Sequence, residues 1–127
     1  MSNHNKDKPK ILLAEDDKFI SRAYCDGLGR AGFAVIHAQD GAEALDMMRR
    51  EKPKLVLLDL IMPTMNGFEF LEEVKKDEML KNIPVIILSN LGQDSDIRKG
   101  RDLGAADYLI KSNCSMAEVV EKIKKYV

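Results

Sequence analysis

Short apolar runs recur along the chain at residues 11–14, 33–38, 55–60, 84–89 and 107–111. Most of these runs are continuously apolar rather than alternating, which is typical of strands in a parallel sheet that is covered on both faces. A segment with apolar residues at helical spacing follows each run. The pattern therefore predicts a strand followed by a helix, repeated five times.

The first two helical segments have apolar stripes and recognisable ends. Gly32 follows the first segment, as glycine often does at the end of a helix, and the stripe is Phe19, Ile20, Ala23, Tyr24 and Leu28. The second segment begins at Asp40, with Glu43 three positions later as a capping box, and ends before Pro53. Its stripe is Ala42, Leu45 and Met48. We expect both stripes to face the core.

The other three helices are predicted from the same spacing. The fourth covers residues 97–103 and ends before Gly104, and the third is marked by Phe68, Phe70, Leu71 and Val74. The last begins at Ser115, which pairs with Glu118 in a second capping box. Its apolar residues are Met116, Val119, Val120, Ile123, Tyr126 and Val127.

Strands that alternate with helices imply right-handed crossovers and a doubly wound α/β fold. The expected sheet has five parallel strands in the order 2-1-3-4-5, with five helices around it. A chain of 127 residues, of which 45% are hydrophobic, has the size of a single domain. We predict a flexible polar tail at residues 1–8 and one domain at residues 9–127.

The charge balance excludes a general attraction to nucleic acid or to anionic lipid, because 20 Lys and Arg residues face 21 Asp and Glu residues. Cys25 and Cys114 have neither metal-ligand nor redox spacing, so we expect reduced thiols that fill space in the core. The polar start lacks a signal sequence, and no later run is long enough for a membrane span. A soluble cytoplasmic protein is expected.

Acidic residues lie at the ends of two predicted strands. In sheets of this kind, ligands bind at the carboxyl ends of the strands, beside the point where the strand order reverses. That point lies between the first strand, which ends in Glu15, Asp16 and Asp17, and the third, which carries Asp59. Asp59 stands in the apolar run "LVLLDL", where an unpaired carboxylate would be costly. We therefore expect the acids to converge on one crevice, where Asp59 has a partner or a chemical role.

Two carboxylates about 4 Å apart repel by roughly 4 kcal/mol at an effective dielectric of about 20, so the cluster needs protonation, a lysine or a divalent ion to offset its charge. Oxygen ligands with open positions favour Mg²⁺. Lys111, at the end of the fifth strand, can supply a fixed positive charge, and Ser89, at the end of the fourth, a hydroxyl donor. Together these groups are the parts of a phosphoryl-transfer site.

The placement of the acids suggests their roles. Asp59 is predicted to attack phosphorus, while Asp16 holds the metal directly and Glu15 holds it through water. The backbone carbonyl of Ile61 could complete the coordination. Asp17 is expected to cap the first helix instead of binding metal, because aspartate strongly favours that position.

Four motifs carry a resemblance to a known family: "ILLAEDD", "LVLLDLIMPTMNGFEFL", "IPVIILSN" and "GAADYLIK". From about Lys10 to Val127 the chain resembles the receiver domain of two-component response regulators, the family of the bacterial chemotaxis response regulator. The resemblance implies the flavodoxin-like fold, Asp59 as the phosphorylated residue and Mg²⁺ as the cofactor. It further implies the acidic pair Glu15 and Asp16, the lysine Lys111, the switch hydroxyl Ser89 and the switch aromatic Tyr108.

The resemblance also implies partners. A histidine kinase or a phosphotransfer protein would donate the phosphoryl group, and the fourth helix, fifth strand and fifth helix would bind a downstream protein. The chain would act as a monomer or weak dimer, without direct contact to nucleic acid or membrane. It would catalyse only its own phosphorylation and slow dephosphorylation. Since no effector sequence follows Val127, the chain is expected to be either a stand-alone adaptor or a fragment of a longer regulator.

Two positions depart from the family pattern. Ser112 follows the lysine where proline is usual, often after a cis bond, and Asn90 follows the switch hydroxyl where a small residue is usual. We expect Asn90 to narrow the access to the phosphate. Ile61 and Leu91 are apolar, and we predict that they screen the acyl phosphate from water and slow its hydrolysis.

Three other functions would require different residues at these positions. An aspartyl-phosphate hydrolase would have an acid two residues after its nucleophile, where this chain has Ile61. A nucleotide- or flavin-binding module would have a glycine-rich turn after the first strand, where this chain has acids that repel phosphate. An interaction module that works without phosphorylation would lack part of the site. Incubation with Mg²⁺ and an acyl phosphate, followed by mass measurement, distinguishes these functions.

Overall fold

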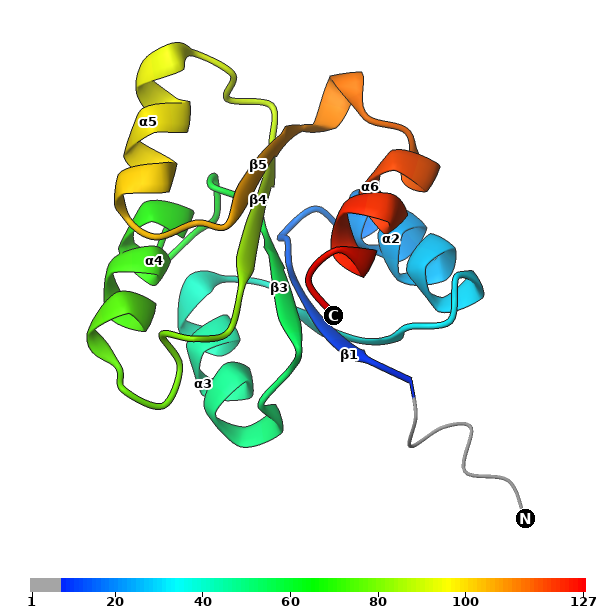
Figure 1. Cartoon of the computed structure of the whole chain (residues 1–127), viewed down its shortest axis with the longest axis horizontal. Coiled ribbons are helices and arrows are strands. Elements are labelled where there is room, and N and C mark those ends of the chain that lie inside the picture. Colours follow the sequence, from blue (N-terminus) through cyan, green and yellow to red (C-terminus); the bar gives the residue numbers. More distant parts are fainter. Residues whose placement is uncertain (1–7) are drawn as a thin grey trace.

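The predicted strands form one parallel sheet in the order β2-β1-β3-β4-β5 (Figure 1). In the computed structural model, which describes residues 8–127, the strands are β1 (Lys10–Ala14), β2 (Ala34–Ala38), β3 (Leu55–Leu58), β4 (Val85–Ser89) and β5 (Asp107–Ile110). Residues 1–7 of the predicted tail lie outside the described part of the chain. The strand order confirms the predicted point of reversal between β1 and β3.

In the described part of the chain, five α-helices cover the sheet on both faces: α2 (Lys18–Arg30), α3 (Gly41–Glu51), α4 (Gly67–Lys76), α5 (Asp94–Asp102) and α6 (Met116–Lys124). A short 3₁₀ turn, η1 (Lys111–Asn113), follows β5. α2 and α6 lie on one face of the sheet, and α3, α4 and α5 lie on the other (Figure 1). This arrangement confirms the doubly wound α/β fold. Within residues 8–127, none of the helices is long and apolar enough to cross a membrane.

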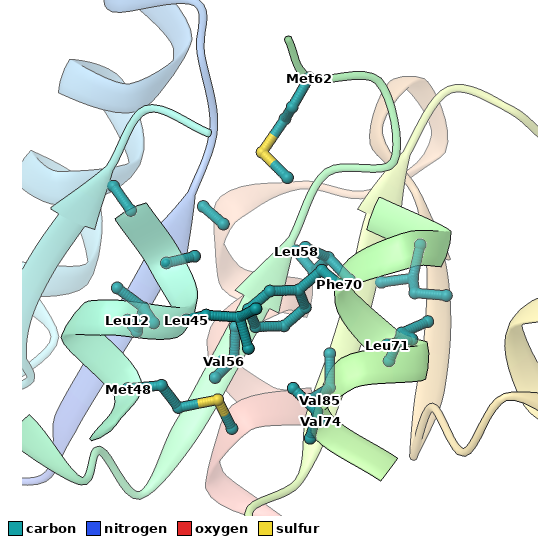
Figure 2. Packing of buried hydrophobic residues seen from close by; sticks show 14 of the residues in the cluster. Leu12, Leu45, Met48, Val56, Leu58, Met62, Phe70, Leu71, Val74 and Val85 are labelled. Atoms are coloured by element: carbon teal, nitrogen blue, oxygen red, sulfur yellow. The ribbon is translucent and has the colours of Figure 1, made fainter. Parts of the chain in front are cut away.

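Successive side chains of each strand enter opposite core layers, as the two-residue period of a strand requires. Leu12, Val56 and Ile87 belong to the layer under α3 and α4, whereas Ile11, Leu57 and Ile86 belong to the layer under α2 and α6. Figure 2 shows the Phe70 ring of α4 beside Val56 and Leu58 of β3. Because β3 is buried on both sides, its run is continuously apolar.

The helix ends follow the predicted capping signals in most places. The Asp17 carboxylate accepts hydrogen bonds from the backbone N–H groups of Phe19 and Ile20, which confirms its role as a cap. Ser115 and Glu118 form a complete capping box. At α3 the box is half formed: Asp40 accepts from the N–H of Glu43, but the Glu43 carboxylate accepts from Gln39.

Part of the predicted core-facing stripe of α2 is wrong. Phe19 is 86% exposed and Ala23 is also exposed, whereas Ser21 and Leu28 are buried. Tyr24 and Cys25, four and three positions before Leu28, pack against the same core layer as Leu28. Phe19 and Ala23 lie outside this face of the helix. In α3, for the same reason, Ala42 is exposed and Ala44 is buried.

The predicted boundaries differ from the structure by two or more residues at three elements. α5 begins at Asp94, three residues earlier than predicted, because its first turn is polar and carries no apolar signal. α6 ends at Lys124, and Tyr126 and Val127 are exposed. β3 ends at Leu58, so Asp59 follows the strand and stands at the mouth of the sheet.

Candidate functional site

Backbone hydrogen bonds hold the carboxyl ends of β1 and β3 beyond the last strand residue. The N–H of Asp59 donates to the carbonyl of Ala14 at 3.0 Å, and the N–H of Glu15 donates to the carbonyl of Ala38 at 3.0 Å. These bonds extend the parallel pairing of β3 with β1, and of β1 with β2, by one residue each. The predicted acids therefore sit on fixed backbone at the point where the strand order reverses.

Glu15, Asp16 and Asp59 converge as predicted. One carboxylate oxygen from each lies within 4.8 Å of the others. Glu15 and Asp59 are buried, at 2% and 8% exposure, while Asp16 is exposed to solvent. Two buried acids and one exposed acid give an oxygen-rich cluster that is open on one side.

The segment after Asp59 is held against the start of α4. The N–H of Gly67 donates to the carbonyl of Leu60 at 2.9 Å, and a Cβ atom at Gly67 would lie 2.7 Å from the Asp59 carbonyl oxygen. Only glycine permits this close approach. The N–H of Ile61 points back to Asp59 Oδ1 at 3.4 Å. Asp59 is thus fixed from both sides.

Lys111 reaches this cluster from the end of β5, as predicted. Its Nζ atom lies 2.5 Å from Glu15 Oε1 and 3.4 Å from Asp59 Oδ2. The lysine side chain is only 11% exposed. A buried ammonium between two buried carboxylates offsets much of their mutual repulsion.

The pKa values of Glu15 and Lys111 are both raised, for different reasons. Burial raises the pKa of Glu15, and the bonds from Lys111 and Asp17 only partly oppose this effect. Burial by itself would lower the pKa of Lys111, but the hydrogen bond to Glu15 and the charge of Asp59 raise it overall. The raised pKa of Lys111 therefore reflects the negative charge of the neighbouring carboxylates, which attracts cations.

The cluster therefore suits a divalent cation. Three carboxylates offer an all-oxygen donor set, and Lys111 alone does not neutralise them. The exposed side of Asp16 leaves room for water or phosphate oxygens as further ligands. Hard divalent cations prefer this kind of partly open oxygen site.

Ser89 lies at the end of β4 and is fully buried. Its hydroxyl oxygen accepts a hydrogen bond from the N–H of Leu91 at 3.2 Å. Because that bond uses a lone pair, the hydroxyl proton remains available to a ligand in the site.

Tyr108 lies on β5, with its hydroxyl donating to the backbone carbonyl of Leu91. Burial, together with the charges of Asp96 and Asp59, raises the pKa of Tyr108 to about 12. The phenol therefore stays protonated, and remains a donor, throughout the neutral range. The predicted switch aromatic is thus connected to the loop that follows Ser89.

The two positions that depart from the family pattern contact one another. Asn90 Oδ1 accepts a hydrogen bond of 2.9 Å from the backbone N–H of Ser112. The Lys111–Ser112 peptide bond is trans, like every other peptide bond in the described residues. The sequence did not predict this contact.

The two predicted screening residues occupy different environments. Ile61 is 63% exposed. Leu91 is partly buried and packs against the core layer under α3 and α4. Ile61 is therefore the one that is open to solvent, while part of the Leu91 side chain is used in packing.

His37 supports the site in a way that the sequence did not indicate. Its Nε2 atom lies 2.7 Å from the backbone carbonyl oxygen of Glu15. A carbonyl oxygen can only accept, so Nε2 carries the proton and donates. His37 is the register partner of Leu13, two residues before Glu15, and this position could have been found only once the strand pairing was known.

Comparisons with known proteins agree with this geometry. The sequence model of the response regulator receiver domain matches residues 11–124. The chain is 41% identical over 104 residues to a probable transcriptional regulator, ycf27, of Porphyridium aerugineum, which covers 82% of this chain and 42% of the relative. The chain thus spans about half or less of the length of the curated relatives that it matches.

Solved structures that are similar along nearly the whole chain include a chemotaxis protein and a response regulator. The chemotaxis protein CheY4 of Vibrio cholerae superimposes with a TM-score of 0.87 at 26% identity, covering 94% of this chain and 99% of that one. The Mn²⁺-bound form of the response regulator Rcp1 has a TM-score of 0.80 at 31% identity, with 93% of each chain covered.

Proposed function

The chain belongs to the response regulator receiver domain family, and on that premise we propose that Asp59 accepts a phosphoryl group and thereby switches the face formed by α5, β5 and α6. The observation that carries the proposal is the convergence of Glu15, Asp16 and Asp59 within 4.8 Å, with the Lys111 ammonium beside them. No other cluster of three such ligands was found in residues 8–127.

In the proposed reaction, an oxygen of Asp59 attacks phosphorus. A new P–O bond forms while the bond from phosphorus to the donor's histidine nitrogen breaks, and that nitrogen keeps the electron pair. Asp59 is held on fixed backbone at the mouth of the sheet, so its carboxylate is oriented before the donor arrives. A protein contributes to phosphoryl transfer mainly by positioning the reacting groups and by stabilising their charge.

Mg²⁺ fits the donor set, with Glu15, Asp16, Asp59 and the backbone carbonyl of Ile61 as the proposed ligands. When bound, the metal supplies positive charge next to the phosphoryl oxygens and the attacking carboxylate. Lys111 supplies the second positive charge from the chain itself. Its contact with Glu15 keeps the ammonium within 3.4 Å of Asp59 before any phosphate is present.

The switch follows from the new oxygens on Asp59. The Ser89 hydroxyl proton and the Lys111 ammonium can both donate to them, and such charge-assisted bonds would draw the loop after β4 inward. Tyr108 is bonded to that loop through Leu91, so its position would change with the loop. The proposed output is a shift between two conformations of the α5, β5 and α6 face.

The proposed donor is a histidine kinase or a phosphotransfer protein, and the proposed receiver of the signal is another protein or another domain. The relatives named as transcriptional regulators are about twice as long as the matched region, which is consistent with output through a separate part. The chain itself would act only on its own phosphorylation state. Free thiols at Cys25 and Cys114 support a cytoplasmic location.

Mass measurement tests the proposed function. After incubation with Mg²⁺ and acetyl phosphate, the chain should gain the mass of one phosphoryl group, and Asp59→Asn should gain none. Asp16→Asn should be labelled much more slowly, because the metal loses its exposed ligand. Equal labelling of the wild type and of Asp59→Asn would refute the assignment, and rapid donor hydrolysis without accumulation would favour a hydrolase.

A further inference from the structure

The loop after β4 and the turn after β5 each begin next to a residue of the phosphorylation site. Asn90 directly follows Ser89, and Ser112 directly follows Lys111. The hydrogen bond from the Ser112 N–H to Asn90 Oδ1, at 2.9 Å, joins these two segments, which are 22 positions apart in the sequence. We refer to this hydrogen bond as the Asn90–Ser112 clamp.

The clamp depends on a donor that proline would not have. Ser112 lies at the start of the 3₁₀ turn η1, where a backbone N–H finds no acceptor within the turn. The residue before the turn, Ile110, provides no side-chain cap. The Asn90 carboxamide from the neighbouring loop fills that role, as a capping side chain does for a longer helix.

Two further contacts connect the same segments. The Tyr108 hydroxyl donates to the carbonyl of Leu91. Gly92 lies so close to Ile110 that a Cβ atom at Gly92 would stand 3.1 Å from Ile110 Cδ1. Segment 90–92 is thus tied at successive residues to segment 108–112.

We infer that Asn90 is a positioning residue, whose clamp on Ser112 holds Ser89 and Lys111 at the spacing needed to bind one phosphoryl group. This inference rests on the proposed function, in which both residues donate to the same phosphoryl oxygens. The Asn90 carboxamide oxygen is bonded to Ser112, and the expected narrowing of access to the phosphate stays a prediction.

A double-mutant cycle tests the clamp. Asn90→Ala removes the acceptor, Ser112→Pro removes the donor, and Ser112→Ala is the matched control because it keeps the backbone N–H. Each of the first two should slow phosphorylation of Asp59 by acetyl phosphate about fivefold, the effect of losing one hydrogen bond of ordinary strength. Ser112→Ala should match the wild type.

The combined variants separate the clamp from unrelated damage. In the Ser112→Pro background, Asn90→Ala should have no further effect on the rate, whereas in the Ser112→Ala background it should retain its full effect. Independent effects in the Ser112→Pro background would overturn the inference. A decrease in the phosphorylation rate that only parallels the decrease in thermal stability across the variants would also overturn it. A positioning role must change the rate in variants that remain folded.

A second readout needs no phosphoryl donor. The Ser112 amide should exchange its hydrogen several-fold faster in Asn90→Ala than in the wild type, while Asn90→Asp, which keeps an acceptor oxygen, should restore protection. If the wild type is not labelled, the proposed function fails, but this exchange measurement still tests the clamp. Unchanged exchange in Asn90→Ala shows that no clamp exists, whatever the labelling result.

Discussion

The helices on one face of the sheet differ in how firmly they are anchored. α4 buries Phe70, Leu71 and Val74 in the core layer, and α3 buries Leu45 and Met48 beside them (Figure 2). α5 lies on the same face (Figure 1), but its only buried residue is Gly100. Burial of large apolar side chains supplies most of the free energy that holds a helix in place, so α5 is held much more weakly.

Exposed polar contacts connect α5 to its neighbour. The Lys99 ammonium lies 4.5 Å from the centre of the Phe68 ring, and Lys75 Nζ donates to the carbonyl of Asp102 at 3.2 Å. Contacts of this kind contribute little at an exposed surface. The acids of the proposed site stand on fixed backbone, whereas α5, which is part of the proposed output face, buries no large apolar side chain.

The largest expected difference concerns thermodynamic stability. Leu71→Ala in α4 should lower the free energy of unfolding by about 2–5 kcal/mol, because a fully buried side chain is lost. Ile97→Ala in α5 removes a half-buried side chain and should cost less than half as much. Urea denaturation measures both values. Equal costs would show that α5 is anchored as firmly as α4.

Glycine-to-alanine substitutions in α5 and in α2 should change the free energy of unfolding in opposite directions. A Cβ atom at Gly100 would lie 2.5 Å from Ile87 Cδ1 and 3.3 Å from Tyr108 Cδ2, so Gly100→Ala should lower stability by about 1–3 kcal/mol. The matched control is Gly29→Ala in α2, where no atom lies within 4 Å of the added group. It should raise stability by roughly 0.5–1 kcal/mol through helix propensity.

Thermal or urea denaturation provides the readout for both glycine variants. If Gly100→Ala raised stability, α5 would be able to move away from the sheet without a loss of stability. The close contact of Gly100 with Ile87 and Tyr108 would then not fix the position of the helix.

The acid cluster should make stability depend on pH. Because burial raises the pKa of Glu15 in the folded chain, its favourable contribution is present below the unfolded pKa and is lost as the pH rises through the folded value. Without added divalent cation, the free energy of unfolding of the wild type should therefore decrease over that range relative to that of Glu15→Gln, which lacks this group. A difference between the two proteins that does not change with pH would contradict the raised pKa.

The smallest expected effect concerns the lifetime of the phosphoryl group. Ile61 is open to solvent and Leu91 is partly packed in the core, so Ile61→Asn should shorten the half-life more than Leu91→Asn does. Loss of label from the purified phosphoprotein measures both half-lives. An unchanged half-life when both residues are made polar would refute the screening role.

The sequence predicted most of the sheet, because apolar runs such as the one before Asp59 leave few alternatives to a buried parallel strand. It also predicted which side chains meet at the strand ends, since parallel strands bring their carboxyl ends to one edge. The phase of the α2 stripe was predicted less well. Phe19 and Ala23 fit a helical spacing, but only packing against the sheet decides which of two overlapping stripes is buried.

Contacts between loops were not predictable in the same way. The Asn90–Ser112 clamp depends on the conformation of two connecting segments and on one side-chain rotamer, none of which leaves a periodic signal. His37 likewise gained its role only from the register between β1 and β2. Periodicity reports burial, and it contains no information about such polar contacts.

Amide hydrogen exchange of the unphosphorylated and the phosphorylated chain tests the central claim most directly, because it compares the two regions in one experiment. The account predicts that exchange changes in residues 90–103 and 107–116 and stays the same in α3 and α4. A change of equal size in α3 and α4, or no change in α5 and the turn after β5 despite complete labelling of Asp59, would contradict it.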